Sequence, residues 1–356
     1  MHDTQILWRA GNGHARTIRH RNRDLVLRTL MEHTAASRAD LSRLTGLARP
    51  TISDLVKDLL DDGVILESGP SQNPRPGKPA VMLEFDQRAV QVIALDLSTP
   101  GQVVGALATP DGRLTHRLSR LTGDDGARVI ADLIDELAQL ASSPPLGIGI
   151  GVPPGSAALL GLGPRIADTL DAPVHLFDDA DLVADAEQRF GTVDTDFLLV
   201  RIGTRIGTAI RVVGDDGAPL ERSIDARELA HVIAGGDPGD TCLCGRIGCV
   251  HAWASVPALS RRLDAAAPAE HGAILAAAGA RLGTSLSVIA AAVDLPTIVL
   301  SGPARIATDE LIDAAATAVR DASHPSLGPA VVRSPLDDAV LRGAATRVVA
   351  REFSPR

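Results

Sequence analysis

All three cysteines of the chain stand in one short run, Cys242-Leu243-Cys244-Gly245-Arg246-Ile247-Gly248-Cys249. The two glycines free the backbone to wrap, so the thiolates can converge on one tetrahedral ion that needs a fourth ligand. His231, upstream of the run, is the natural candidate. A disulfide is the alternative, but it would leave an odd thiol and would conflict with a cytoplasmic location. The run therefore predicts a structural zinc site made of His231, Cys242, Cys244 and Cys249.

Length and composition predict two or three packed globular units. The 356 residues are 45% hydrophobic and 22% charged, which excludes extensive disorder. Only 2% are aromatic, which argues against the stacking platforms of proteins that bind single-stranded nucleic acid. Binding of duplex DNA is not excluded. No run of about 18 uncharged apolar residues and no apolar leader segment is present, so we expect a cytoplasmic protein without membrane contact.

Charge is unevenly distributed along the chain. The formal net charge is −9, yet residues 1–60 carry ten Lys and Arg against six Asp and Glu. A compact basic head on an acidic, soluble body suits a protein that binds nucleic acid through its N-terminal part.

The basic head has the apolar spacing of helices from about Arg23 to Gly63. Three helices fit, with breaks near Ala35 and Gly46. Ser37 followed by Asp40 is a capping-box variant that starts the second helix, and Pro50 opens the third. Two strand-like runs then follow, 64–67 and 80–85, joined by a long Gly- and Pro-rich tip, which predicts a wing.

The third helix turns an apolar face inward and leaves polar side chains outside, namely Arg49, Thr51, Ser53 and Lys57. Short donors at the N-terminal end of such a helix suit base edges in the major groove and phosphates, and Arg75 and Lys78 in the wing suit the backbone or the minor groove. The alternative is a small helical bundle with solvated charges.

Beyond Asp86 the pattern becomes an alternation of strands and helices. The expected strands are 91–96, 102–108, 113–118, 146–152, 197–201, 207–213 and 297–300, with a helix over 127–140 and long Ala-rich helices near the end. Two repeated α/β halves imply a two-lobed body with a cleft.

The segment from Ser37 to Ser53 resembles the winged helix-turn-helix of regulators in the ROK family (repressors, open reading frames, kinases), and 74–79 resembles the wing tip. The stretch 228–231 followed by the cysteine run is similar to the zinc signature of the family. The resemblance covers about residues 23–350. It implies an all-α/winged helix-turn-helix domain over 21–86 and an α/β, two-lobed actin-like ATPase (ribonuclease H-like) ROK effector domain over 90–356. Residues 1–20 are polar, and we expect them to form a flexible N-terminal tail.

The phosphate-binding machinery departs from the family pattern. An Asp followed by a Gly-Gly-Thr turn is expected after the first strand, but Ser98, Thr99 and Pro100 follow here, and their side chains and a missing N–H obstruct a phosphate. In the second loop, 203–207, Arg205 replaces a Gly. These changes predict that the body is not an active kinase.

The resemblance also suggests where an effector binds. Asp179 falls on the catalytic base of the family and Asp178 replaces a polar sugar contact, although paired acids at a helix start are equally common as caps. Glu228 and His231 retain sugar-contact positions, and His251 stands where a Glu normally follows the last cysteine. The expected effector site is Asp178, Asp179, Glu228, His231 and His251.

Together these features predict a homodimeric or homotetrameric transcriptional regulator, a repressor in carbohydrate metabolism. It would bind a double-stranded DNA operator and a small effector, a sugar or a sugar derivative. Two alternatives stay open: an active ATP-dependent sugar kinase, and a regulator that responds to a non-sugar ligand or a protein partner.

Overall fold

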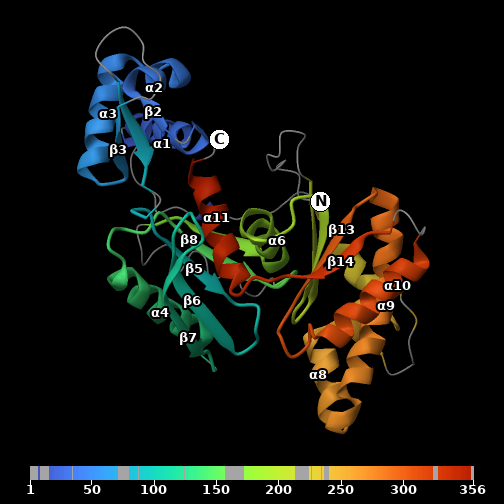
Figure 1. Cartoon of the computed structure of the whole chain (residues 1–356). Coiled ribbons are helices and arrows are strands. Elements are labelled where there is room, and N and C mark those ends of the chain that lie inside the picture. Colours follow the sequence, from blue (N-terminus) through green and yellow to red (C-terminus); the bar gives the residue numbers. More distant parts are fainter. Residues whose placement is uncertain are drawn as a thin grey trace.

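The computed structural model describes residues 7–8, 16–33, 35–70, 80–86, 88–123, 125–156, 172–212, 224–225, 227–233, 235, 240–323 and 328–353. These residues form a small N-terminal head and a body with two sheets (Figure 1).

The head consists of three helices and a three-stranded antiparallel sheet. Its helices are α1 (Arg16–His33), α2 (Arg38–Thr45) and α3 (Arg49–Asp61). The strands β2 (Ala35–Ser37), β3 (Ile65–Pro70) and β4 (Val81–Phe85) are ordered β2-β4-β3. The apolar faces of the helices pack into one core with Leu83 of the sheet. The three helices and the hairpin are therefore as predicted.

Two features of the head differ from the expectation. The break near Ala35 contains β2, which is too short to produce a periodic pattern. The N-terminal segment expected as a tail contributes Leu7–Trp8, which pair as β1 with the body, and α1 begins at Arg16 rather than near Arg23.

The first lobe contains a six-stranded sheet ordered β1-β9-β8-β5-β6-β7. The strands after β1 are β5 (Val92–Asp96), β6 (Gln102–Ala108), β7 (Leu114–Leu121), β8 (Ile148–Val152) and β9 (Val174–Asp178). The helix α4 (Gly126–Leu140) buries its apolar face against this sheet.

The second lobe contains a five-stranded sheet ordered β12-β11-β10-β13-β14. Its strands are β10 (Phe197–Ile202), β11 (Ile206–Arg211), β12 (Ile224–Asp225), β13 (Thr297–Ser301) and β14 (Ala330–Arg333). The helices are η2 (Arg227–His231), α7 (Val250–Ala254), α8 (Val256–Ala265), η3 (Pro268–Glu270), α9 (His271–Val293) and α10 (Asp309–Ala322).

The two sheets share one topology. In the first, β5 pairs antiparallel with β6 and parallel with β8, which pairs parallel with β9. In the second, β10 pairs antiparallel with β11 and parallel with β13, which pairs parallel with β14. The predicted repetition of α/β halves is thus confirmed.

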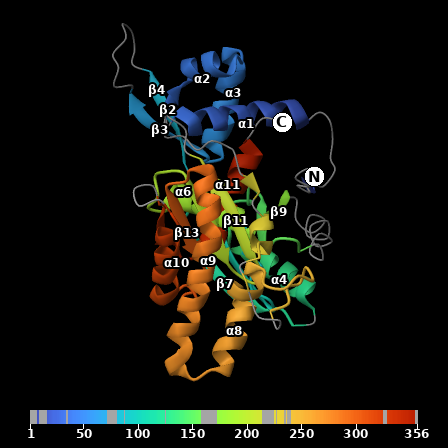
Figure 2. The ribbon, with the colours of Figure 1, turned by 90° about the vertical axis from the view of Figure 1, so that its right-hand side faces the viewer.

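Two helices lie between the sheets and join the body to the head. The first, α6 (Asp179–Phe190), contacts β10 and β11, and the second, α11 (Ala339–Phe353), contacts β5 and β8. They pack against each other, and α11 also reaches α1 of the head (Figures 1 and 2). One continuous apolar cluster includes buried residues of the head, α6 and α11.

Among the described residues, one helical segment, Pro268–Val293, is long and apolar enough to cross a membrane. Its most apolar window is 47% buried, and α9 packs against α10, α7 and α8. A core helix of a folded domain has these properties.

Candidate functional site

The outer face of α3 carries the predicted DNA contacts. Arg49, Ser53 and Lys57 are exposed and Thr51 is half-buried, while Ile52 and its apolar neighbours point into the head. No described residue forms an ion pair with Arg49 or Lys57. The cationic side chains therefore remain available to a polyanion. The wing residues Arg75 and Lys78 lie outside the described part of the chain.

The supporting helix α2 is fixed by local hydrogen bonds. The Ser37 hydroxyl accepts from the Asp40 N–H at 3.2 Å, and the Ser37 N–H donates to the Asp40 carboxylate at 3.3 Å, which completes the predicted capping box. Gly46 ends the helix with a positive φ of 71°, as the turn before α3 requires. Arg38 of α2 also pairs with Glu67 at the wing, a contact that the sequence did not predict.

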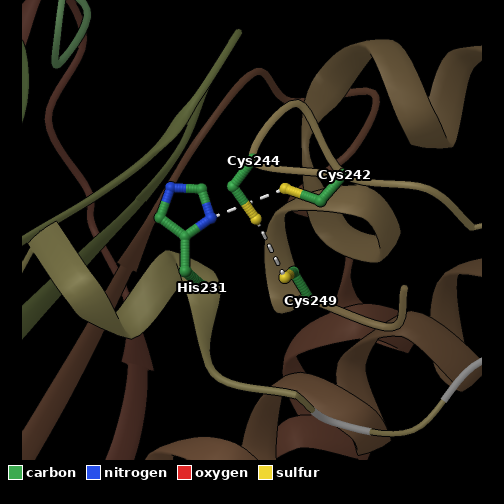
Figure 3. Close-up of side chains that lie close together, drawn as sticks. All are labelled: His231, Cys242, Cys244 and Cys249. Atoms are coloured by element: carbon green, nitrogen blue, oxygen red, sulfur yellow. Dashed lines mark hydrogen bonds between the residues drawn. The ribbon is translucent and has the colours of Figure 1, made fainter. Parts of the chain in front are cut away.

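The four predicted metal ligands converge at one point (Figure 3). Their ligand atoms all lie within 4.8 Å of one another. Cys244 Sγ is 3.6 Å from Cys249 Sγ, and Cys242 Sγ is 3.5 Å from His231 Nδ1. Ligands about 2.3 Å from a tetrahedral ion lie roughly 3.8 Å apart, so these positions fit a bound metal.

The cysteine loop is held by the backbone and by one arginine that the sequence did not single out. The Cys242 N–H donates to the Arg246 carbonyl at 2.8 Å, and the Gly248 N–H donates to the Asp240 carbonyl at 3.1 Å. Arg262 of α8 donates to the Asp240 carboxylate at 2.6 Å and to the Trp253 carbonyl at 3.0 Å. Arg262 therefore ties the loop to the end of α7.

The thiols differ in acidity. Hydrogen bonds with the backbone and side chain of Arg246 lower the pKa of Cys244 to about 6. Burial raises the pKa of Cys249 to about 12. A metal cation at the cluster would favour the thiolate of the buried cysteine as well.

Asp179, at the family's base position, is the first residue of α6 and is only 1% exposed. Arg201 on β10 donates its Nε to Asp179 Oδ2 at 2.9 Å. Burial alone would lower the pKa of Arg201, but the carboxylates of Asp179 and Asp96 raise it overall. The guanidinium therefore stays charged and binds one oxygen of the carboxylate, while the buried Asp179 Oδ1 has no hydrogen-bond partner among the described residues. The neighbouring Asp178 is the N-cap residue of the helix.

The two loops expected to hold phosphates contact each other across the lobes. Thr204, after β10, donates its hydroxyl to the Ser98 carbonyl, after β5, at 2.6 Å. Asp96 accepts hydrogen bonds from the Ser98 N–H, at 2.8 Å, and from the Ser98 hydroxyl. The Thr204 hydrogen bond therefore joins the two turns in this conformation.

The remaining candidate residues lie between the metal cluster and the second loop. His251 is buried, and its Nδ1 accepts from the Ile206 N–H at 3.4 Å. Its ring centroid is 6.2 Å from that of His231. Burial, then the neighbouring His231 and Arg205, lower the pKa of His251. Glu228 lies in η2, and its side chain is outside the described part of the structure.

This protein combines a winged helix-turn-helix head with a two-lobed body of repeated α/β halves. A winged helix-turn-helix DNA-binding model matches residues 21–65 and the ROK family model matches residues 152–348. The chain therefore belongs to the ROK family.

Two relatives resemble this chain over about two thirds of its length. The chain is 28% identical over 272 residues to a putative xylose repressor of Caldicellulosiruptor sp., covering 69% of this chain and 67% of that protein. It is 26% identical to the DNA-binding transcriptional repressor Mlc of Escherichia coli over 69% of this chain and 66% of that protein. The chain thus spans about two thirds of the length of these relatives.

Two solved structures share the fold. A ROK family transcriptional regulator, a homologue of E. coli Mlc, superposes with a TM-score of 0.68 at 23% identity, covering 94% of this chain and 96% of that one. A ROK glucokinase from Streptomyces griseus gives 0.58 at 20% identity, covering 72% and 98%. The actin-like, sugar-kinase fold of the body is therefore confirmed.

Proposed function

We propose that this protein is a transcriptional repressor in which the winged head binds an operator and the ROK body senses a small effector. The observation that carries the proposal is the winged helix-turn-helix head, whose α3 presents Arg49, Ser53 and Lys57 to solvent. The proposal implies a homo-oligomer, because paired heads are needed to bind two half-sites about one helical turn apart. It also implies a cytoplasmic location.

We propose further that the body has no appreciable sugar-kinase activity. Phosphoryl transfer depends on positioning and on close backbone approach to the phosphates. Ser98, Thr99 and Pro100 occupy the first turn, and the Thr204 hydrogen bond joins it to the second. The family base, Asp179, is buried and its Oδ2 is bound by Arg201, which disfavours removal of a proton from a sugar hydroxyl in this conformation.

The metal is proposed to be one structural zinc ion per chain. Four protein ligands, three thiolates and an imidazole, leave no coordination position for a water. The ion would fix the cysteine loop beside η2 and His251. We place the effector in this region, near His251, Asp178 and Asp179. Elemental analysis of freshly purified, reduced protein tests this: less than about half an equivalent of zinc contradicts it, and Cys244→Ser should lower both zinc content and melting temperature.

Operator binding is the central test. Selection from random duplexes followed by fluorescence anisotropy should yield a sequence with inverted half-sites. Arg49→Ala should then cost about 1–3 kcal/mol of binding free energy, because a base contact is lost. Arg305→Ala, an exposed arginine of the body, is the matched control and should change nothing. Failure of the full chain to enrich any sequence would contradict the proposal.

The effector and kinase hypotheses are separated by a second assay. Hexoses and D-xylose, the sugar named for several relatives, are added first to the operator complex and then to a coupled ATP-consumption assay. We expect no ATP turnover with any of these sugars, and release of the operator by a sugar or by one of its acidic derivatives. Turnover of about 1 per second or faster, typical of working enzymes, would instead identify an active kinase.

A further inference from the structure

The end of β10 and the turn that follows it carry two arginines with different surroundings. Arg201 is held by the buried carboxylate of Asp179. Arg205 has no hydrogen-bond or ion-pair partner among the described residues. It is half-buried, so its guanidinium is partly removed from water without a compensating acceptor.

Arg205 lies where the lobes face each other. Its Nη1 would be 3.3 Å from a Cβ added to Gly155, in the turn that follows β8 of the first lobe. On the other side, the N–H of the next residue, Ile206, donates to His251 Nδ1 at 3.4 Å. The guanidinium therefore sits between the first lobe and the histidine next to the metal loop, inside the region proposed for the effector.

The nearby carboxylates face other arginines rather than Arg205, although Oδ1 of Asp179 has no hydrogen-bond partner among the described residues. Asp179 pairs with Arg201, and Asp181 accepts a hydrogen bond from Arg211 at 3.0 Å. Asp96 and Asp178 raise the pKa of Arg201, which places their negative charge near that arginine. Two changes from the family pattern act in the same direction: Arg205 stands at a glycine position and His251 at a glutamate position. Both make the site more positive.

We propose, on the basis of the effector function proposed above, that Arg205 binds an oxyanion and that the effector is an acidic polyol, a sugar acid or a sugar phosphate, rather than a neutral sugar. A guanidinium presents a planar fork of donors that matches the two oxygens of a carboxylate or a phosphate. The ion pair between Asp179 and Arg201 reduces the repulsion that an unpaired carboxylate would exert on such a ligand.

The test compares matched neutral and acidic probes by titration calorimetry on the full chain. The pairs are D-xylose with D-xylonate, and D-glucose with D-gluconate and D-glucose 6-phosphate. At least one acid should bind about tenfold or more tightly than its neutral parent. The gluconate and glucose 6-phosphate arms distinguish a carboxylate from a phosphate, and inorganic phosphate alone should bind more weakly than the preferred sugar derivative.

Variants assign the preference to one residue. Arg205→Gln should weaken binding of the preferred acid about 10- to 100-fold and leave the neutral parent unchanged, while Arg205→Lys should retain part of the preference. Arg305→Ala is the control and should leave all affinities unchanged. Equal affinities for acid and parent, no binding of any acid, inorganic phosphate binding as tightly as the sugar derivatives, or an unchanged preference in Arg205→Gln would each overturn the proposal.

Operator binding without ligand, measured on the same preparations, keeps this result separate from the proposed function. If the operator binds and D-xylose matches D-xylonate, only the anionic class of the effector is wrong. If no operator is enriched, the regulator proposal fails whatever the ligand data show.

Discussion

At the scale of single residues, Ser37 and Asp40 decide how well the head holds its recognition helix. Ser37→Ala removes the side chain that caps α2 and should cost about 1 kcal/mol of unfolding free energy. Ser53→Ala, on the exposed face of α3, is the matched control: it should weaken operator binding and leave the urea midpoint unchanged. Equal midpoints for the wild type and Ser37→Ala would contradict the capping role.

Asp40 makes part of this stability dependent on pH. Hydrogen bonds from Ser37, then from Arg43, lower the pKa of Asp40 below its ordinary value of 3.8. A lowered pKa in the folded state means that the contribution is complete above the unfolded-state pKa and is lost as pH falls through the folded one. The stability difference between wild type and Asp40→Asn should therefore be constant from pH 7 to about 5 and shrink below about 4. Urea unfolding over this range measures it, and a difference that grows towards low pH would contradict the assignment.

At the scale of elements, α6 and α11 behave as one unit between the sheets. A Cβ on Gly343 of α11 would overlap the Leu182 carbonyl of α6, so the two backbones approach as closely as a glycine permits. Asp185 of α6 accepts from Arg211 of β11 at 2.8 Å and from Arg347 of α11 at 2.5 Å. The second sheet is thus tied to the helix that reaches the head.

Breaking this network should be costly. Asp185→Ala leaves Arg211, only 3% exposed, with fewer compensating acceptors, and we expect a loss of about 3 kcal/mol of unfolding free energy. Asp132→Ala removes an exposed ion pair with Arg128 on α4 and should cost less than about 0.5 kcal/mol. Chemical denaturation of the two variants checks the contrast, and similar losses in both would show that the network does not stabilise the body.

At the scale of the whole molecule, the hydrogen bond between Thr204 and Ser98 joins the lobes. Thr204→Val keeps the shape of the side chain and removes the donor, so it should favour separation of the lobes by about 0.5–1.5 kcal/mol. The backbone N–H groups of Ser98, Thr99 and Gly101 should then exchange with solvent faster, while those of α4 should not change. Unaltered exchange in the 98–101 turn would show that this bond does not control closure.

Head and body are linked more closely than two separate domains would be. The apolar cluster runs from α1 through α11 to α6, and α6 begins at Asp179 in the proposed effector region. A ligand that moves α6 would therefore also affect α11, because α6 packs against α11 and α11 contacts α1 of the head. This packing supplies a physical route between effector and operator.

Features that depend on nearby residues were predictable from the sequence. The metal ligands Cys242, Cys244 and Cys249 lie in one run, the Ser37 cap precedes its helix directly, and the inward face of α3 follows helical spacing. Although β9, β12 and β14 were not predicted, the other strands of the two lobes, β5 to β8, β10, β11 and β13, also follow from apolar runs, because burial on both sides requires such runs. Local chemistry and periodicity fully specify these features.

The tertiary structure alone decided which distant side chains meet. Arg201 and Asp179, Thr204 and Ser98, and the Asp185 network each join separate segments. An arginine on a strand has the same local sequence whether it faces solvent or a buried carboxylate, so no spacing rule distinguishes the two. The short strand β2 escaped prediction for a related reason, since its pairing with β4 and not its own three residues makes it a strand.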